Sequence, residues 1–486
     1  DKKRLSDRRQ DVQDGSPEEG VPALDEIASQ AKSEGLKATQ ADKDIKIMDE
    51  NVAAPDYGSM PTPDLVGVTA FTSQATRAYE LAAEFRARGA SVVMGGIHAT
   101  MRTEEALEHV DAVVKGEAES IWGQVLEDFQ QGKLERVYES SLLEAHKISG
   151  ARHDLLPSGF AFGSIQTTRG CPLNCTFCSV TRFNGKRFRL RPIKDVIDEL
   201  KTIKEKRVLF VDDNVCGTSR SHMARTKELF QAMIDAKLNK QWIGQATVNI
   251  ADDEELVRLA AKSGCMGVLI GYESVTKEGL IEVNKKFNIR DADRIKASIR
   301  RLQRYGITVM GSFIFGLDTD RKGIGVQIAE AAHAYGLDSF NLLLMTPLPG
   351  TQLWDEMEAK GRIAANSFPN DWQYYILCLP VAHYMHLSWD EMIHEFITAC
   401  RCFYSYRRIA GRFVTSLVHS RKPITALTAL VTNLLYRRDL PLNIKRFNRY
   451  DLSRGAVPFD RQMAIAESAR VAQRDRLEVP GEKIAV

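Results

Sequence analysis

Two series of short apolar segments, separated by amphipathic helical patterns, run along this chain of 486 residues and constrain its fold more than any other feature. Strands that alternate with helices through short loops are typical of parallel sheets covered by helices. In the first series, strands are predicted at 45–48, 65–69, 91–94 and 112–114, and helices at 23–34, 75–89 and 104–109. A helix at 122–129 and a short strand at 137–138 follow. We therefore predict an α/β protein that begins with a doubly wound, Rossmann-like domain over residues 21–145.

The second series contains six strand–helix units. Its strands are predicted at 165–168, 208–211, 242–248, 266–271, 308–315 and 339–344. The clearest helices between them are predicted at 193–205, 223–236, 253–263 and 291–305. Six consecutive units predict a partial (β/α)6 barrel over residues 158–355, whose site would lie at the carboxyl ends of the strands.

The two ends of the chain have a different character. Residues 1–20 are polar and charged, so we expect a disordered or processed terminus. Residues 356–486 are predicted to form a mainly helical substrate or cap region, of which the last ~25 residues are expected to be flexible. The net charge of +2 argues against bulk nucleic-acid binding. No apolar run reaches the ~18–20 residues of a transmembrane helix, and we expect a cytoplasmic protein.

Three cysteines follow the first strand of the second series, with the spacing Cys-x3-Cys-x2-Cys at Cys171, Cys175 and Cys178. Three thiolates from one loop suit an iron–sulfur cluster and would leave one iron open to a small molecule. Open metal positions usually mark chemistry. A zinc knuckle is the alternative, but no second ligand pair lies nearby in the sequence. With eight cysteines in the chain, a disulfide framework is not expected, and the other five are interpreted as buried or partly buried thiols.

This loop resembles the cysteine motif of the radical S-adenosylmethionine (SAM) superfamily. The resemblance implies a 4Fe-4S cluster on the three cysteines, with SAM on the open iron. It places Phe177 near the adenine. Asp213 follows the second strand and could hold the amino group of SAM, although a helix cap or an Asx turn would also explain an acid there. Gln245, Glu273 and Ser312, on or at the ends of later strands, complete the candidate SAM site, and the segment 346–351 resembles the closing loop of the family.

The sequences Met-Gly-Gly-Ile-His-Ala-Thr (94–100) and Val-Val-Lys-Gly-Glu-Ala-Glu (113–119) resemble the cobalamin-binding domain that precedes some radical SAM barrels. Glycines allow the backbone to approach a large flat ligand. The resemblance implies cobalamin as a further cofactor, and the candidate contacts are Thr69, Thr72, Gly95, Gly96, His98, Gly116 and Glu117. An Asp-x-His-x-x-Gly motif is missing, so His98 is not expected to bind cobalt. A cobalamin-like fold without cobalamin is the alternative.

Basic and aromatic residues suggest further contacts. Arg182, Lys186, Arg187, Arg189 and Arg191 are interpreted as a solvated basic face, or as a docking patch for an acidic electron donor such as flavodoxin or ferredoxin. The aromatic and histidine residues between 372 and 386 could line a substrate cavity, with core packing as the alternative. Residues 401–447 mix arginines with apolar residues at helical spacing. They predict an ordinary surface bundle, or alternatively a peripheral membrane contact.

Together these patterns favour a radical SAM enzyme that modifies an unactivated carbon, by methylation of a lipid-like or natural-product substrate. Radical cyclisation, ring rearrangement or carbon–carbon coupling is the alternative chemistry. A cobalamin- or cluster-binding regulator is the alternative outside catalysis. A tRNA methylthiotransferase is disfavoured because that group carries three further cysteines before the barrel, whereas residues 1–150 contain none.

Overall fold

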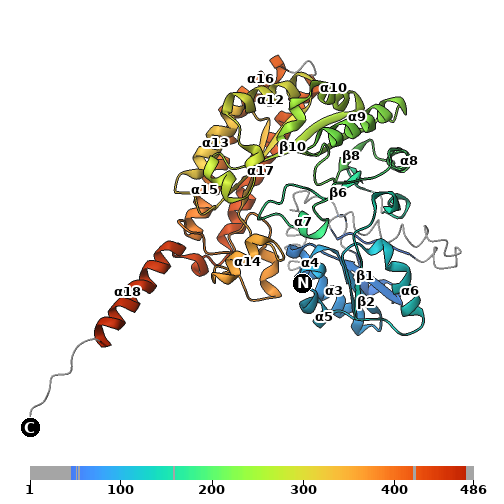
Figure 1. The fold of residues 1–486 in the computed structure, drawn as a ribbon, viewed down its shortest axis with the longest axis horizontal. Helices are drawn as coiled ribbons and strands as arrows, with labels where there is room; N and C mark the ends of the chain where they lie inside the picture. The colour runs from blue at the N-terminus through green and yellow to red at the C-terminus, as the bar shows by residue number, and fades with distance from the viewer. Residues whose placement is uncertain (1–44, 51, 53–54, 157–158, 420–422, 478–486) are drawn as a thin grey trace, which may run out of the picture.

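The computed structural model describes residues 45–50, 52, 55–156, 159–419 and 423–477. It contains two parallel sheets and a helical carboxyl-terminal region (Figure 1). The smaller sheet lies in the blue part of the ribbon, and the larger sheet follows it along the chain. The expectations for residues 1–20 and for a helix at 23–34 lie outside the described residues.

The amino-terminal sheet has four parallel strands in chain order. They are β1 (Leu65–Thr69), β2 (Ser91–Gly95), β3 (Ala112–Lys115) and β4 (Val137–Glu139). Its helices are α3 (Ala75–Ala87), α4 (Gly96–Met101), α5 (Thr103–His109) and α6 (Trp122–Gln130). The strand predicted at 45–48 is wrong, because these residues are described without strand pairing.

Helices cover both faces of this sheet, and the pleat explains how. Val92 and Met94 of β2 pack into the same core cluster as α3, whereas Val93 between them packs with Trp122 and Val125 of α6. Successive strand residues point to opposite faces, so a continuous apolar strand requires cover on both sides. This confirms the doubly wound prediction.

The larger sheet has six parallel strands whose spatial order is their chain order, with β5 and β12 at its two edges. The strands are β5 (Gly163–Ile165), β8 (Arg207–Phe210), β9 (Gln241–Ala246), β10 (Cys265–Glu273), β11 (Thr308–Phe315) and β12 (Ser339–Leu344). Its main helices are α8 (Ile193–Thr202), α9 (Arg220–Asp235), α10 (Glu254–Ser263), α11 (Lys277–Glu282), α12 (Ala292–Arg304) and α13 (Ile324–Tyr335). The partial barrel is thereby confirmed.

Local sequence explains where these helices begin and end, and α10 is an example. The Asp253 carboxylate accepts the Leu256 amide at 2.9 Å and caps the helix. Gly264, with φ +105°, ends it in the left-handed conformation that glycine adopts most readily. Burial alternates along β9, and its buried apolar residues, such as Trp242 and Ala246, lie in the main core.

The first barrel strand is shorter than predicted. β5 ends at Ile165, and Thr168–Arg169 instead forms β6, which pairs antiparallel with β7 (Arg189–Leu190). The cause lies just after β8, the next strand of the barrel: the buried Asp212 carboxylate accepts the amides of Thr167, at 2.7 Å, and Thr168. The chain therefore leaves the sheet just before the cysteines.

The carboxyl-terminal region is mainly helical, as expected. Its helices are α14 (Gln352–Ala359), α15 (Trp389–Phe403), α16 (Tyr406–His419), α17 (Pro423–Asn448) and α18 (Phe459–Leu477). The flexible end is corrected in part, because α18 forms a helix that extends away from the rest of the molecule (Figure 1). In the part of the chain that the structure describes, no helix is both long and apolar enough to cross a membrane.

Candidate active site

The cysteine loop lies between β6 and the short helix α7 (Val180–Phe183), at the carboxyl end of the barrel. Three hydrogen bonds join it to elements that follow later barrel strands. The Thr176 amide donates to the Val283 carbonyl at 3.3 Å, the Leu353 amide donates to the Thr176 carbonyl at 2.9 Å, and Asn284 Nδ2 donates to the Asn174 carbonyl at 2.8 Å. The loop is therefore held between the end of α11 and the start of α14.

All three cysteines of this loop are free and partly buried. Burial raises the pKa of all three thiols, that of Cys175 to about 11 and that of Cys178 to about 12. A metal must displace these protons on binding. Among the described residues, no three Cys, His, Asp or Glu side chains surround a single-ion site. Soft thiolates that each bind a separate iron match an iron–sulfur cluster, so the donor set fits this group.

The two acids after β8 hold the segment that enters the cysteine loop. Asp212 accepts the amides that end β5, and burial raises its pKa to about 7. Asp213 accepts the Gly170 amide and Asn184 Nδ2, both at 3.1 Å. These two acids therefore anchor the segments around the cysteine loop, a role that differs from the helix cap or Asx turn considered from the sequence. A role of Asp213 toward SAM stays a prediction.

At the end of β10, Glu273 forms a buried ion pair with Lys285. A bulge interrupts the pairing of β10 with β11 here, and Glu273 has φ +66°, which is unusual for a residue other than glycine. Burial lowers the pKa of Lys285, but the Glu273 carboxylate and the Cys175 thiol outweigh it and raise the pKa overall. Sequence analysis missed Lys285, because nothing in the Asn-Lys-Lys sequence around it indicates that this lysine turns inward.

The other candidate SAM contacts lie on nearby strands. Ser312 of β11 pairs with Gly271 at the β10 bulge and is buried. Gln245 of β9 pairs with Leu269. Phe177 is partly buried and packs against the main core. The structure thus brings Glu273 and Ser312 together, and it places Gln245 one strand further along the sheet.

The candidate cobalamin contacts gather at the carboxyl edge of the amino-terminal sheet. Thr69 and Gly95 end neighbouring strands in register. Gly96 has φ +83°, and a side chain there would clash with Thr69 Oγ1. Gly116, with φ +86°, donates its amide to Thr100 Oγ1 at 3.0 Å. Thr72 is buried at the start of the short helix η3 (Thr72–Gln74). Because glycines occupy these positions, no side chains cover the backbone at this edge, and the edge fits a flat ligand.

The His98 side chain is fully buried, between Tyr79 of its own domain and Trp372 of the carboxyl-terminal region. Its Nε2 lies 2.8 Å from the Tyr79 hydroxyl, and its ring centroid lies 5.3 Å from that of Trp372. Trp372 donates its indole N–H to Glu105 at 2.7 Å. The residues between 372 and 386 include the fully buried Trp372 and Tyr384, so core packing explains most of this stretch.

The basic face predicted after the cysteines is wrong for two of its five members. Arg189 and Arg191 are buried, and they pair with Glu117 and with Glu199 at 2.6 Å. Arg182, Lys186 and Arg187 are exposed. The prediction failed because the partner acids lie 72 and 8 residues away, at distances that charge patterns along the sequence do not reveal.

The carboxyl edges of the two sheets face each other. Glu117, directly after β3, pairs with Arg189 and lies 3.5 Å from Arg169, which precedes the cysteines by two residues. A second contact joins the two domains at Gly350. Met101 of α4 packs so closely against this glycine that any side chain at position 350 would clash with the Met101 sulfur. Figure 1 shows α4 next to α7 and α14. The cysteine loop thus lies where the two edges meet.

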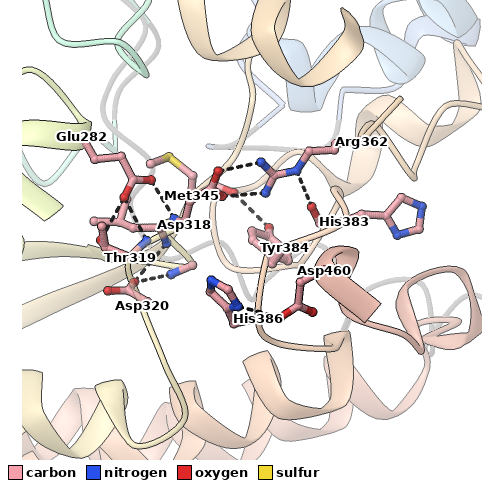
Figure 2. A network of polar contacts seen from close by, with 12 residues as sticks. Glu282, Asp318, Thr319, Asp320, Met345, Arg362, His383, Tyr384, His386 and Asp460 are labelled. Atoms are coloured by element: carbon pink, nitrogen blue, oxygen red, sulfur yellow. Dashed lines mark hydrogen bonds and ion pairs between the residues drawn. The ribbon is translucent and has the colours of Figure 1, made fainter. Parts of the chain in front are cut away.

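A polar network joins the carboxyl-terminal region to the segments that follow β10 and β11 (Figure 2). Arg362 donates two hydrogen bonds to Asp318, at 2.8 and 2.9 Å, and a third to the His383 carbonyl at 2.8 Å. Glu282 accepts the amides of Asp318 and Thr319. The adjacent pocket is lined by Thr176 of the cysteine loop and by charged residues that include Glu282, Glu356 and Lys360. This network ties the carboxyl-terminal region to the loop after β11.

Comparison with known proteins agrees with this geometry. The family described as Radical SAM superfamily matches residues 165–322, and the B12 binding domain matches residues 23–126. The bacteriochlorophyllide d C-12(1)-methyltransferase of Chlorobaculum tepidum is 30% identical over 402 residues, which is 78% of this chain and 83% of the relative. The chain belongs to the cobalamin-dependent radical SAM methyltransferases.

Two further relatives of this radical SAM enzyme are more distant. The hopanoid C-2 methylase of Rhodopseudomonas palustris is 24% identical over 362 residues, covering 72% of this chain and 68% of the relative. The solved structure of the methyltransferase TsrM from Kitasatospora setae, with cobalamin and a [4Fe-4S] cluster bound, shares the fold with a TM-score of 0.53 and 19% identity. The alignment covers 64% of this chain and 66% of that one.

Membership in this family establishes the coarse function. The chain is an enzyme, and its cofactors are a 4Fe-4S cluster, SAM and cobalamin. The alternatives of a non-catalytic regulator and of a fold that has lost cobalamin are therefore set aside.

Proposed function

We propose that this enzyme methylates an unactivated carbon of an apolar, lipid-like or natural-product substrate. The observation that carries the proposal is that the carboxyl edges of the two sheets face each other with the cysteine loop between them. When the cofactors are bound, reductive cleavage of SAM supplies a radical that abstracts hydrogen, and cobalamin supplies the methyl group. Both reagents must reach one carbon, so their sites must share one cavity.

The residue roles follow the same arrangement. Cys171, Cys175 and Cys178 would bind the cluster, and Glu273 with Ser312 would contact SAM beside the β10 bulge. Phe177, Asp213 and Gln245 remain candidate SAM contacts. Thr69, Thr72, Gly95, Gly96 and Gly116 would contact cobalamin, largely through backbone. We propose residues 21–145, 158–355 and 356–486 as the corresponding domains.

The test is anaerobic reconstitution followed by turnover with SAM that carries a deuterated methyl group. Wild-type enzyme should form 5′-deoxyadenosine and transfer the label to carbon. Cys175→Ala should lose the cluster and all cleavage, whereas Cys402→Ala, a thiol on α15 outside the loop, should keep both. Cleavage without label transfer, in enzyme that retains cobalamin, would point to cyclisation or rearrangement instead.

The substrate class is inferred from the relatives. A tetrapyrrole such as bacteriochlorophyllide d and a hopanoid are the two probes, since the relatives named above act on these polycyclic, largely apolar compounds. We expect labelled product from one of these probes and none from a small polar acceptor such as tryptophan. Product from tryptophan alone would contradict an apolar substrate.

We further propose that the hairpin of α16 and α17 is the surface that contacts lipid. Seven exposed apolar residues recur at helical spacing on it: Val414, Leu417, Val418, Leu427, Val431, Leu434 and Leu435. Residues 406–448 contain nine Lys and Arg against one Asp and no Glu. Basic amphipathic helices bind anionic bilayers. Sedimentation with phosphatidylglycerol vesicles should fall in a Val418→Ser/Leu435→Ser variant, and equal recovery of wild type and variant would contradict this contact.

The electron donor would dock on the exposed part of the basic segment. Arg182, Lys186 and Arg187 are exposed there, and steering by opposite charge favours an acidic flavodoxin or ferredoxin. Reduction of the cluster by flavodoxin should slow in a Lys186→Glu/Arg187→Glu variant, while reduction by dithionite should not. An equal flavodoxin rate in both proteins would exclude this patch.

A further inference from the structure

Two glutamates of the amino-terminal domain and two arginines beside the cysteine loop form one buried ion cluster across the domain boundary. Its members are Glu117, Glu119, Arg169 and Arg189, each with only 3 to 5% of its side chain exposed. Burying a charge is costly unless it is paired and hydrogen-bonded. The cluster contains two acids and two bases, so its formal charges cancel.

Each acid forms an ion pair with an arginine of the cluster. Glu117 accepts from both terminal nitrogens of Arg189, one of them at 2.8 Å, and from the Leu143 amide at 2.7 Å. Glu119 lies 2.5 Å from Arg169 Nη2, whose other terminal nitrogen lies 3.5 Å from Glu117. Burial raises the pKa of Glu117, but Arg189 and Arg169 outweigh it and lower the pKa overall. The Glu117 carboxylate is thus directed at the barrel rather than at the glycine edge of its own sheet.

The two arginines hold the base of the cysteine loop. Arg169 and Arg189 are directly opposite each other in the β6–β7 ribbon. The chain between them contains all three cysteines, and Arg169 precedes Cys171 by two residues. Arg189 also donates to the Asn184 carbonyl at 3.1 Å, inside the loop. The two glutamates therefore contact the base of the cysteine loop from the amino-terminal domain.

We propose that Arg169 and Arg189 are positioning residues. Through these two arginines, Glu117 and Glu119 hold the cysteine loop at a fixed place and orientation relative to the carboxyl edge of the amino-terminal sheet, where cobalamin would bind. The importance of this fixed position rests on the proposed function. A radical formed beside the cysteine loop must reach the same carbon as a methyl group held at the edge of the amino-terminal sheet. The four residues would themselves contact neither SAM nor cobalamin. Buried ion pairs of this kind can specify a unique arrangement even where their net contribution to stability is small.

The chain offers a matched control. Arg191 and Glu199 form an ion pair with 2% and 5% side-chain exposure, but both residues belong to the barrel. Glu119→Gln and Glu199→Gln each remove one buried negative charge that faces an arginine. Glu119 pairs across the domain boundary, whereas Glu199 pairs with Arg191 of the barrel and with His153 and the Ala151 amide of the linker before it. A general loss of stability would affect both variants alike.

The experiment compares amide hydrogen exchange over residues 170–185 in the reconstituted holoenzymes. We expect exchange about tenfold faster in Glu119→Gln than in wild type, and near wild type in Glu199→Gln. Iron and cobalamin contents should stay at wild-type levels in both. Equal exchange in Glu119→Gln and wild type, or an equal increase in the two variants, would overturn the proposal.

Two further measurements complete the test. Arg189→Lys keeps the charge but loses the planar fork, so it should give an intermediate increase in exchange; this variant decides the matter if Glu119→Gln does not fold. In turnover, Glu119→Gln should form more 5′-deoxyadenosine per methylated product than Glu199→Gln. The exchange result does not depend on methyl transfer, so a failure of the proposed function is distinguishable from a failure of this inference.

Discussion

At the scale of single residues, Lys285 and Glu273 show how strongly the barrel mouth depends on pairing. Their side chains are only 10% and 8% exposed, and each is the charge partner of the other. Lys285→Met should leave the Glu273 carboxylate buried without its cation and destabilise the protein by about 3–5 kcal/mol. The double variant Glu273→Gln/Lys285→Met should regain part of this loss. Thermal denaturation of apoprotein checks both, and equal midpoints for the single and double variants would contradict the pairing.

Asp320 gives a prediction about pH. It accepts the Gly316 amide at 2.8 Å and the Leu317 amide at 3.0 Å, and burial raises its pKa from 3.8 to about 7. The folded state therefore holds this proton more tightly than the unfolded state. The contribution of Asp320 to stability is fully present below about pH 4 and is lost as pH rises through about 7. Urea midpoints should be measured at pH 5, 6, 7 and 8. The midpoint of Asp320→Asn should rise relative to that of wild type as pH rises, and a constant difference between the two midpoints would refute this.

At the scale of elements, α15 stabilises the start of α13 from the side. The two oxygens of the buried Glu395 accept the Gly323 and Gly325 amides at 2.7 and 2.8 Å. A carboxylate there satisfies free N–H groups and meets the positive end of the helix. Glu395→Gln should lower stability by about 1–2 kcal/mol. Glu330→Gln, which removes a half-exposed pair with Arg408, should cost less than about 1 kcal/mol. Similar urea midpoints for the two variants would argue against the cap.

At the scale of the whole molecule, the carboxyl-terminal region binds the amino-terminal domain as well as the barrel. Trp372 donates to Glu105, and Thr76 Oγ1 donates to the Pro369 carbonyl at 2.8 Å. Trp372→Phe removes the indole N–H and should destabilise this contact by about 1–2 kcal/mol. Trp354→Phe is the control, because Trp354 lies in the same aromatic cluster, 5.7 Å from Trp372. Limited proteolysis should release the amino-terminal domain earlier only from Trp372→Phe; release at equal rates would contradict the contact.

The two parallel sheets, the barrel and the cysteine loop could be predicted from the sequence alone. They depend on local periods and short spacings: the continuous apolar run of β2, caps such as Asp253, and three cysteines within eight residues from Cys171 to Cys178. Such local patterns can be recognised in the sequence without knowing which elements pack against them.

Which charges turn inward, and where the cysteine loop lies relative to the amino-terminal sheet, depends on the tertiary fold. The sequence placed Arg189 on a solvated basic face, whereas the fold joins it to Glu117, 72 positions away along the chain. The first barrel strand likewise ends early because Asp212, 45 positions further on, takes the Thr167 amide. The physical reason is the same in both cases. The burial cost of a charge is set by partners that the fold brings near, and these partners leave no period or spacing along the chain.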